Sequence, residues 1–66
     1  MTAYEELKAW CEKHLDKTNW QETFLDYDFI EDKQNVEKKA IQIKDDYNSV
    51  FIVFEENGSF CWIEPN

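Results

Sequence analysis

The sequence predicts an α+β fold in which one N-terminal helix packs on a three- or four-stranded antiparallel meander sheet, in the order α-β-β-β-β. Three observations predict it: a helix-start signal followed by an apolar stripe, alternating apolar segments in the rest of the chain, and Asn57-Gly58 between two apolar runs. Because the chain has 66 residues, we expect one small domain spanning residues 1–66.

The helix is predicted to begin after Thr2, because Thr2 and Glu5 have the spacing of a capping box. An apolar stripe follows at spacings of three and four residues, as expected for the buried side of a helix: Tyr4, Leu7, Cys11 and His14 or Leu15. The pattern fades near Asp16, where we expect the helix to end.

Residues 20–32 fit two periodicities. With a period of two, Leu25 and Tyr27 face one way with Phe29, and Asp26 and Asp28 face the other. With a helical period, a stripe forms instead from Trp20, Phe24 and Tyr27. We favour the strand because Thr, Phe and Tyr are strand formers and Asp is unfavourable inside a helix. A short helical turn at residues 19–22 is compatible with either.

A polar loop at residues 32–37 is expected to precede a strand in which Ile41 and Ile43 face the core and the alternate residues, Ala40, Gln42 and Lys44, face solvent. Residues 45–49 then reverse the chain. Asn57-Gly58 predicts a hairpin with a two-residue type I′ turn. Pro65 lacks an amide hydrogen, so the last strand should end at Glu64 or just before it.

Counting outward from this turn gives the hairpin two apolar faces. One is expected to pack on the helix: Val50, Ile52, Phe54, Cys61 and Ile63. The other is the predicted partner-binding surface: Phe51, Val53, Phe60 and Trp62, with Glu55 and Glu64 at its edges. Covering these aromatic rings is worth several kcal/mol at about 25 cal/mol per Å². We therefore expect either residues 20–30 or another molecule to cover this face.

Fifteen acidic residues against seven lysines give a net charge of −8, which disfavours direct binding to nucleic acid or anionic membranes. We expect a small acidic protein-interaction module without catalytic activity or cofactor, which binds a protein partner or a second copy of itself. The alternative is an acidic inhibitor, a DNA-mimic or immunity-type protein of the kind that phages or mobile elements encode. It would block a basic nucleic-acid-binding partner with spaced carboxylates: Asp26, Asp28, Glu31 and Asp32. The acidity could equally serve solubility alone.

Other reactive residues do not form motifs. Cys11 and Cys61 lie fifty positions apart without metal-ligand spacing, so we expect buried free thiols and a cytoplasmic protein. His14 has no local nucleophile, and Ser49 and Ser59 are expected in turns. A calcium loop starting at Asp26 would lack the ligand at its fifth position and the required glycine at its sixth, so no metal site is predicted. The sequence offers no evident small-molecule substrate.

Overall fold

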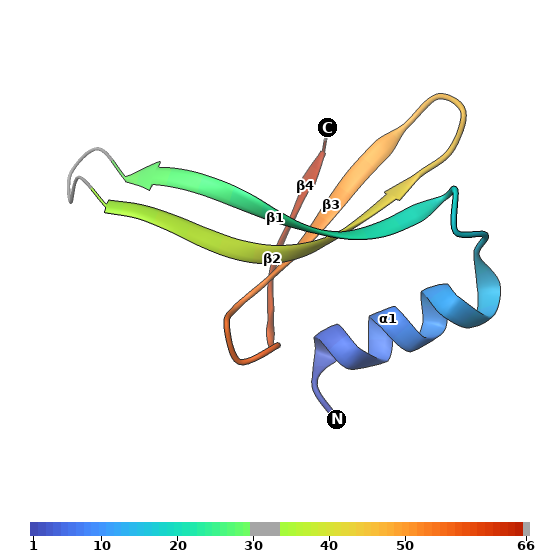
Figure 1. Cartoon of the computed structure of the whole chain (residues 1–66), viewed down its shortest axis with the longest axis horizontal. Coiled ribbons are helices and arrows are strands. Elements are labelled where there is room, and N and C mark those ends of the chain that lie inside the picture. The colour runs from blue at the N-terminus through green and yellow to red at the C-terminus, as the bar shows by residue number, and fades with distance from the viewer. Residues whose placement is uncertain (30–33, 66) are drawn as a thin grey trace.

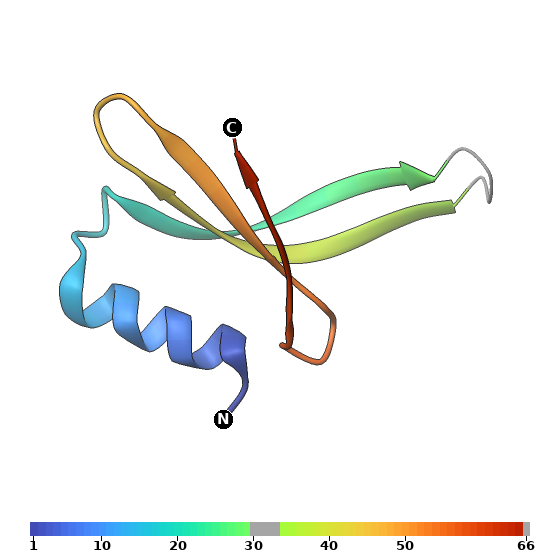
Figure 2. The same cartoon turned by 180° about the vertical axis from the view of Figure 1, so that it is seen from behind.

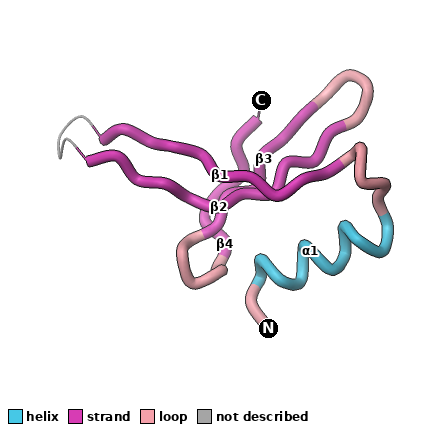
Figure 3. The backbone as a smooth tube through the Cα atoms, in the orientation of Figure 1, coloured by secondary structure: helices cyan, strands magenta, loops and turns pink. Residues whose placement is uncertain are grey.

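The computed structural model describes residues 1–29 and 34–65. It contains helix α1 (Ala3–His14) and four strands: β1 (Trp20–Phe29), β2 (Gln34–Lys44), β3 (Ser49–Phe54) and β4 (Phe60–Pro65). The strands form one antiparallel sheet in the order β1-β2-β3-β4, so that each pairs with its neighbour in sequence (Figures 1 and 3). This confirms the predicted meander and gives it four strands.

Helix α1 begins as the capping signal predicts. The Thr2 hydroxyl accepts a hydrogen bond from the Glu5 amide at 3.2 Å and donates one to the Glu5 carboxylate at 3.0 Å. The Tyr4 amide donates to the Gly58 carbonyl at 2.9 Å, which joins the start of the helix to the β3–β4 turn. The helix ends at His14, slightly before the predicted end.

Strand β1 settles the ambiguity in favour of the strand for residues 20–29, and residues 30–32 lie outside the described residues. Its register with β2 places Trp20 opposite Ile43 and Tyr27 opposite Val36, so alternate residues face opposite sides of the sheet. The chain turns before β1, at residues 16–19, where the Asn19 amide donates to the Asp16 carbonyl at 2.9 Å. The predicted polar loop is wrong for residues 34–37, which belong to β2.

The helix side of the sheet holds the main core. Cys11, Ile41 and Phe54 are buried there, and partly buried apolar side chains pack around them: Tyr4, Leu7, Leu15, Trp20, Ile43 and Ile52. The Tyr4 ring meets the Phe54 ring edge-on, with centroids 5.1 Å apart. The predicted helix stripe is thus confirmed, with Leu15 rather than His14 as its last member.

The β1–β2 hairpin is longer than the rest of the sheet. Strand β3 pairs with β2 only from Ala40 onward, whereas β1 and β2 remain paired out to Phe29 and Gln34. Figures 1 and 2 show the β3–β4 hairpin crossing the β1–β2 hairpin steeply. This is the coil that the right-handed twist of strands produces, and it curls the outer half of the long hairpin over the face opposite the helix.

The β3–β4 turn differs from the predicted two-residue turn. The Gly58 amide donates to the Glu55 carbonyl at 2.9 Å, and the Glu55 amide donates to the Ser59 carbonyl at 2.8 Å. This is a three-residue loop that ends at Gly58 with φ +91°. Val53 still pairs with Trp62 as predicted, but Phe54 pairs with Phe60, so the register shifts by one residue around Cys61. Strand β4 also includes Pro65, opposite Val50.

The bulge reverses two of the predicted face assignments. Because paired residues point to the same side of a sheet, Phe60 lies on the helix side with Phe54. Cys61 becomes the extra residue of the bulge and bonds to Glu55 on the opposite side. The faces predicted for Phe60 and Cys61 were wrong because regular strand pairing was assumed up to the turn.

Replacing Gly58 by alanine is expected to lower the free energy of unfolding by about 2–3 kcal/mol, since the left-handed backbone and the helix cap are disturbed together. A Cβ atom at this position would lie 2.7 Å from the Thr2 hydroxyl oxygen and 2.8 Å from the Thr2 Cβ. Urea unfolding measures the loss. Glu56→Ala, at an exposed position in the same turn, is the control, and equal losses in the two variants would contradict the steric argument.

Candidate interaction surfaces

The face of the sheet opposite α1, here called the second face, has a buried apolar centre. Ala40 and Val53 are fully buried there, although α1 lies on the other side. The outer half of the β1–β2 hairpin supplies cover: the Tyr27 ring packs edge-on against Trp62 with centroids 5.3 Å apart. The Tyr27 hydroxyl also donates to Glu64 Oε2 at 3.2 Å. Residues of β1 therefore cover part of this face, one of the two alternatives that the sequence left open.

A polar cluster lies beside Trp62 on the second face. Lys38 Nζ lies 2.8 Å from Glu55 Oε2 and 5.9 Å from the centroid of the Trp62 ring. The Cys61 thiol donates to the other oxygen of Glu55. These two contacts lower the pKa of Glu55, and the bond to Glu55 raises the pKa of Lys38. Glu55, which was predicted at the edge of the partner-binding surface, therefore has both carboxylate oxygens engaged within the chain.

The same bond favours the protonated form of the Cys61 thiol. The hydrogen bond to Glu55 raises the pKa of the thiol above its ordinary value, and burial raises it further. Because the thiolate is the reactive form, a smaller fraction of Cys61 is reactive near neutral pH. We expect Glu55→Gln to speed alkylation of Cys61 several-fold near neutral pH, because the neighbouring negative charge is removed. Peptide mass spectrometry after timed labelling of the native protein measures the rate. Cys11, which is buried, should stay slow in both proteins, and an unchanged Cys61 rate would contradict the assignment.

The six residues of the predicted partner-binding surface do not share one exposed face. Val53 is fully buried, Trp62 packs against Tyr27, and Phe60 lies on the helix side. Phe51 and Glu64 are partly buried on the second face. The predicted face was therefore wrong for Phe60, because the spacing of the residues does not reveal the bulge at Cys61. The partner-binding role of the six residues remains a prediction, and Phe60 is the exposed one among them.

The acidic residues of the alternative hypothesis are only partly described. Asp26 is exposed on the helix side of β1, directly opposite the exposed Glu37 of β2. Asp28 lies in β1 opposite Asn35. Glu31 and Asp32 lie outside the described residues.

A second polar cluster joins α1 to β1. The Tyr4 hydroxyl donates to Glu22 Oε2 at 2.6 Å, and Lys8 Nζ lies 3.0 Å from Glu22 Oε1. The bond from Tyr4, together with Lys8, lowers the pKa of Glu22, while burial and this bond raise the pKa of Tyr4. Both oxygens of Glu22 are occupied, so the cluster holds the helix on the sheet.

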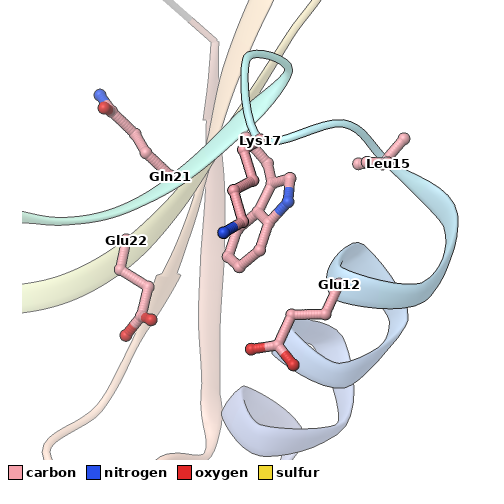
Figure 4. A pocket seen from close by; sticks show the side chains of 6 residues that line it. Glu12, Leu15, Lys17, Gln21 and Glu22 are labelled. Atoms are coloured by element: carbon pink, nitrogen blue, oxygen red, sulfur yellow. The ribbon is translucent and has the colours of Figure 1, made fainter.

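An open pocket of about 540 Å³ lies between the end of α1 and the start of β1. Its lining consists of Glu12, Leu15, Lys17, Trp20, Gln21 and Glu22 (Figure 4). Trp20 Nε1 is buried and makes no hydrogen bond in the described part of the chain. The lining supplies two carboxylates and one ammonium group, and Glu22 is already paired with Lys8.

The remaining predicted reactive residues have structural contacts. Cys11 and Cys61 are both free thiols, but Cys61 is only partly buried, which corrects the prediction of two buried thiols. The His14 ring lies against the Trp10 ring, with centroids 5.1 Å apart. The Ser49 hydroxyl accepts a hydrogen bond from Gln42, and the Ser59 hydroxyl donates one to Asn57.

Residues 1–29 and 34–65 contain neither a cluster of metal ligands nor a membrane-spanning helix. Within these residues, no three His, Cys, Asp or Glu side chains are grouped closely enough to hold a metal ion. Helix α1, the helix in this part of the chain, is not long and apolar enough to cross a membrane.

An exposed apolar surface lies where the sequence did not place it, along the helix side of β4. Phe60 and Ile63 of β4 and Trp10 of α1 are 54%, 58% and 50% exposed. Ile63 pairs with Ile52, which packs in the core, so the helix covers β3 but does not extend over β4. Together with the exposed Pro65, we call these residues the β4 patch: Trp10, Phe60, Ile63 and Pro65. Sequence reasoning assigned Ile63 to this side but expected α1 to cover it.

Comparison with known proteins finds no matching family model, no similar curated protein and no similar solved structure.

Proposed function

We propose that the chain is a small acidic protein-interaction module without catalytic activity, and that it binds through the β4 patch. The observation that carries the proposal is the exposure of two large apolar side chains, Phe60 and Ile63, on the helix side of β4, together with the exposed Trp10 of α1. Exposed apolar side chains that share one side of a strand commonly mark a protein interface. Tryptophan and other aromatic side chains are also the residues that contribute most to binding when a partner excludes water from them.

The rest of the chain supports the same role. The charged groups of the two polar clusters, Lys8 with Glu22 and Lys38 with Glu55, pair with one another, which is typical of structural contacts rather than of a catalytic site. The net charge of −8 keeps the rest of the surface soluble. As part of this proposal we place the protein in the cytoplasm, where free thiols such as Cys11 and Cys61 stay reduced.

Affinity capture from the native host, followed by mass spectrometry, tests the proposal. The comparison uses the wild-type chain, the double variant Trp10→Lys, Ile63→Lys, and the control Tyr47→Lys. Tyr47 is a 93% exposed aromatic residue in the β2–β3 loop, so the control introduces the same kind of charge away from the β4 patch. We expect a protein that the wild type and the control recover and the double variant loses. Equal recovery by all three chains would contradict binding through this patch.

An acidic inhibitor is the second candidate function, and one contact favours it. Asp26 and Glu37 are exposed and directly opposite one another in the β1–β2 ladder. Like charges in this position are destabilising, so their presence suits a surface that meets a cationic partner. Asp26→Asn with Glu37→Gln should weaken capture of a basic nucleic-acid-binding protein, and salt should weaken it in the unmodified chain. If neither the two substitutions nor salt weakens the capture, inhibition through these carboxylates is excluded.

A further inference from the structure

The helix side of β4 is free of charge. The register with β3 places Phe60, Ile63 and Pro65 on this side, and all three are exposed. The one charged residue of the strand, Glu64, lies on the second face, where it accepts a hydrogen bond from Tyr27. In a chain of net charge −8, this strip has no carboxylate to attract a cationic partner.

Trp10 is the member of the β4 patch that lies on the helix. Lys8 pairs with Glu22 of β1, and Glu12 lines the pocket beside β1, so this flank of α1 faces the β1 edge. Successive helical residues are rotated by about 100°, which places Trp10 on the opposite flank, turned away from β1. Figure 2 views the molecule from the side on which β4 is in front of the sheet.

Strand β4 also has a free hydrogen-bonding edge. Strands β1 and β4 are the two outer strands of the sheet in the described part of the chain. Proteins commonly protect such edges with charged side chains. On its helix side β1 has the exposed Asp26, opposite the exposed Glu37 of β2, which would repel another acidic chain, whereas β4 has no charge there. The β4 edge is therefore the one that an equally acidic molecule can approach.

We propose that the occupant of the β4 patch is a second copy of this chain, paired antiparallel through β4 about a twofold axis. This rests on the proposed function and names its partner. A twofold axis perpendicular to the sheet continues it from one copy into the other and keeps both helices on the same face. The uncharged strips then meet each other, and the free backbone groups of both β4 edges pair, as in strand addition.

The size of this contact sets the expected affinity. A standard interface buries about 800 Å² on each partner, roughly 15% of the 5170 Å² surface of this chain. Because the proposed contact is limited to the six residues of β4 and Trp10, we expect a weak dimer with a dissociation constant of about 10–100 µM. Each copy has a net charge of −8, so salt should strengthen dimerisation by screening the repulsion. A complex with a cationic partner would weaken instead.

Sedimentation equilibrium of the full chain from about 10 µM to about 1 mM, at low and high salt, tests the proposal. We expect a monomer–dimer equilibrium that shifts toward dimer with salt, loss of the dimer in Ile63→Lys and in Trp10→Lys, and retention of it in Tyr47→Lys. Urea unfolding of each variant confirms that it is folded. Hydrogen exchange locates the contact, with slower exchange of β4 amides at dimer concentrations.

A chain that stays monomeric at about 1 mM in high salt would overturn the proposal, as would a dimer insensitive to Ile63→Lys or one that protects β1 instead of β4. The same experiments distinguish failure of this dimer from failure of the proposed function. If the chain is monomeric but the double lysine variant loses a captured protein, the β4 patch binds that other partner and only the second copy is excluded.

Discussion

Phe54→Ala is expected to lower the free energy of unfolding by about 3–5 kcal/mol, the usual cost of removing a buried aromatic ring. Phe54 is 1% exposed and packs with Cys11 and Ile41 in the main core, where the Tyr4 ring contacts it edge-on. A chain of this length has a total stability of about 3–10 kcal/mol. The variant should therefore be largely unfolded or close to it at room temperature, as circular dichroism and urea titration would show.

The matched control is Phe24→Ala. Phe24 is the same residue type on the helix side of the same sheet, but it is 64% exposed. We expect this variant to lose less than about 1 kcal/mol, as at most surface positions. If Phe24→Ala is as damaging as Phe54→Ala, the helix does not lie where the structure places it.

Trp62→Glu is expected to destabilise the folded chain by about 2–4 kcal/mol, through lost packing and added charge repulsion. Trp62 packs against Tyr27 and lies under the ammonium group of Lys38. The new carboxylate would lie near those of Glu55 and Glu64. Were the second face an interface between molecules, the same substitution would instead give a folded monomer of ordinary stability.

Ile63→Glu is the control for this substitution. It places the same charge on the next residue of β4, at a side chain that is 58% exposed on the opposite side of the strand. Its urea midpoint should stay close to that of the wild type. Equal destabilisation by the two variants would show that the contact of Tyr27 with Trp62 does not stabilise the fold.

Local signals predicted the elements well. The capping residues Thr2 and Glu5 placed the helix start, and alternation of Ile41 and Ile43 with polar residues placed the centre of β2. Strong β-formers identified β1 correctly, although a helical stripe was also present. Each of these signals depends on residues within one turn or one strand, and that is why the sequence alone is sufficient for them.

The candidate site required information that spacing does not contain. The pairing of Phe54 with Phe60 depends on a three-residue loop, and Asn57-Gly58 is compatible with that loop as well as with the shorter turn that was expected. One extra residue moves Phe60 to the other face. The contact of Tyr27 with Trp62 depends on the coil of the whole sheet, which accumulates over several strands.

We propose that copies of the chain bind one another through the β4 patch and not through the second face, and the three tryptophans test this directly. Trp10 lies in the β4 patch, Trp20 packs against the main core and Trp62 lies on the second face. Their indole N–H signals can be followed by NMR as the protein concentration is raised. We predict the largest change at Trp10, a smaller one at Trp62 and none at Trp20. A larger change at Trp62 than at Trp10 would contradict the account.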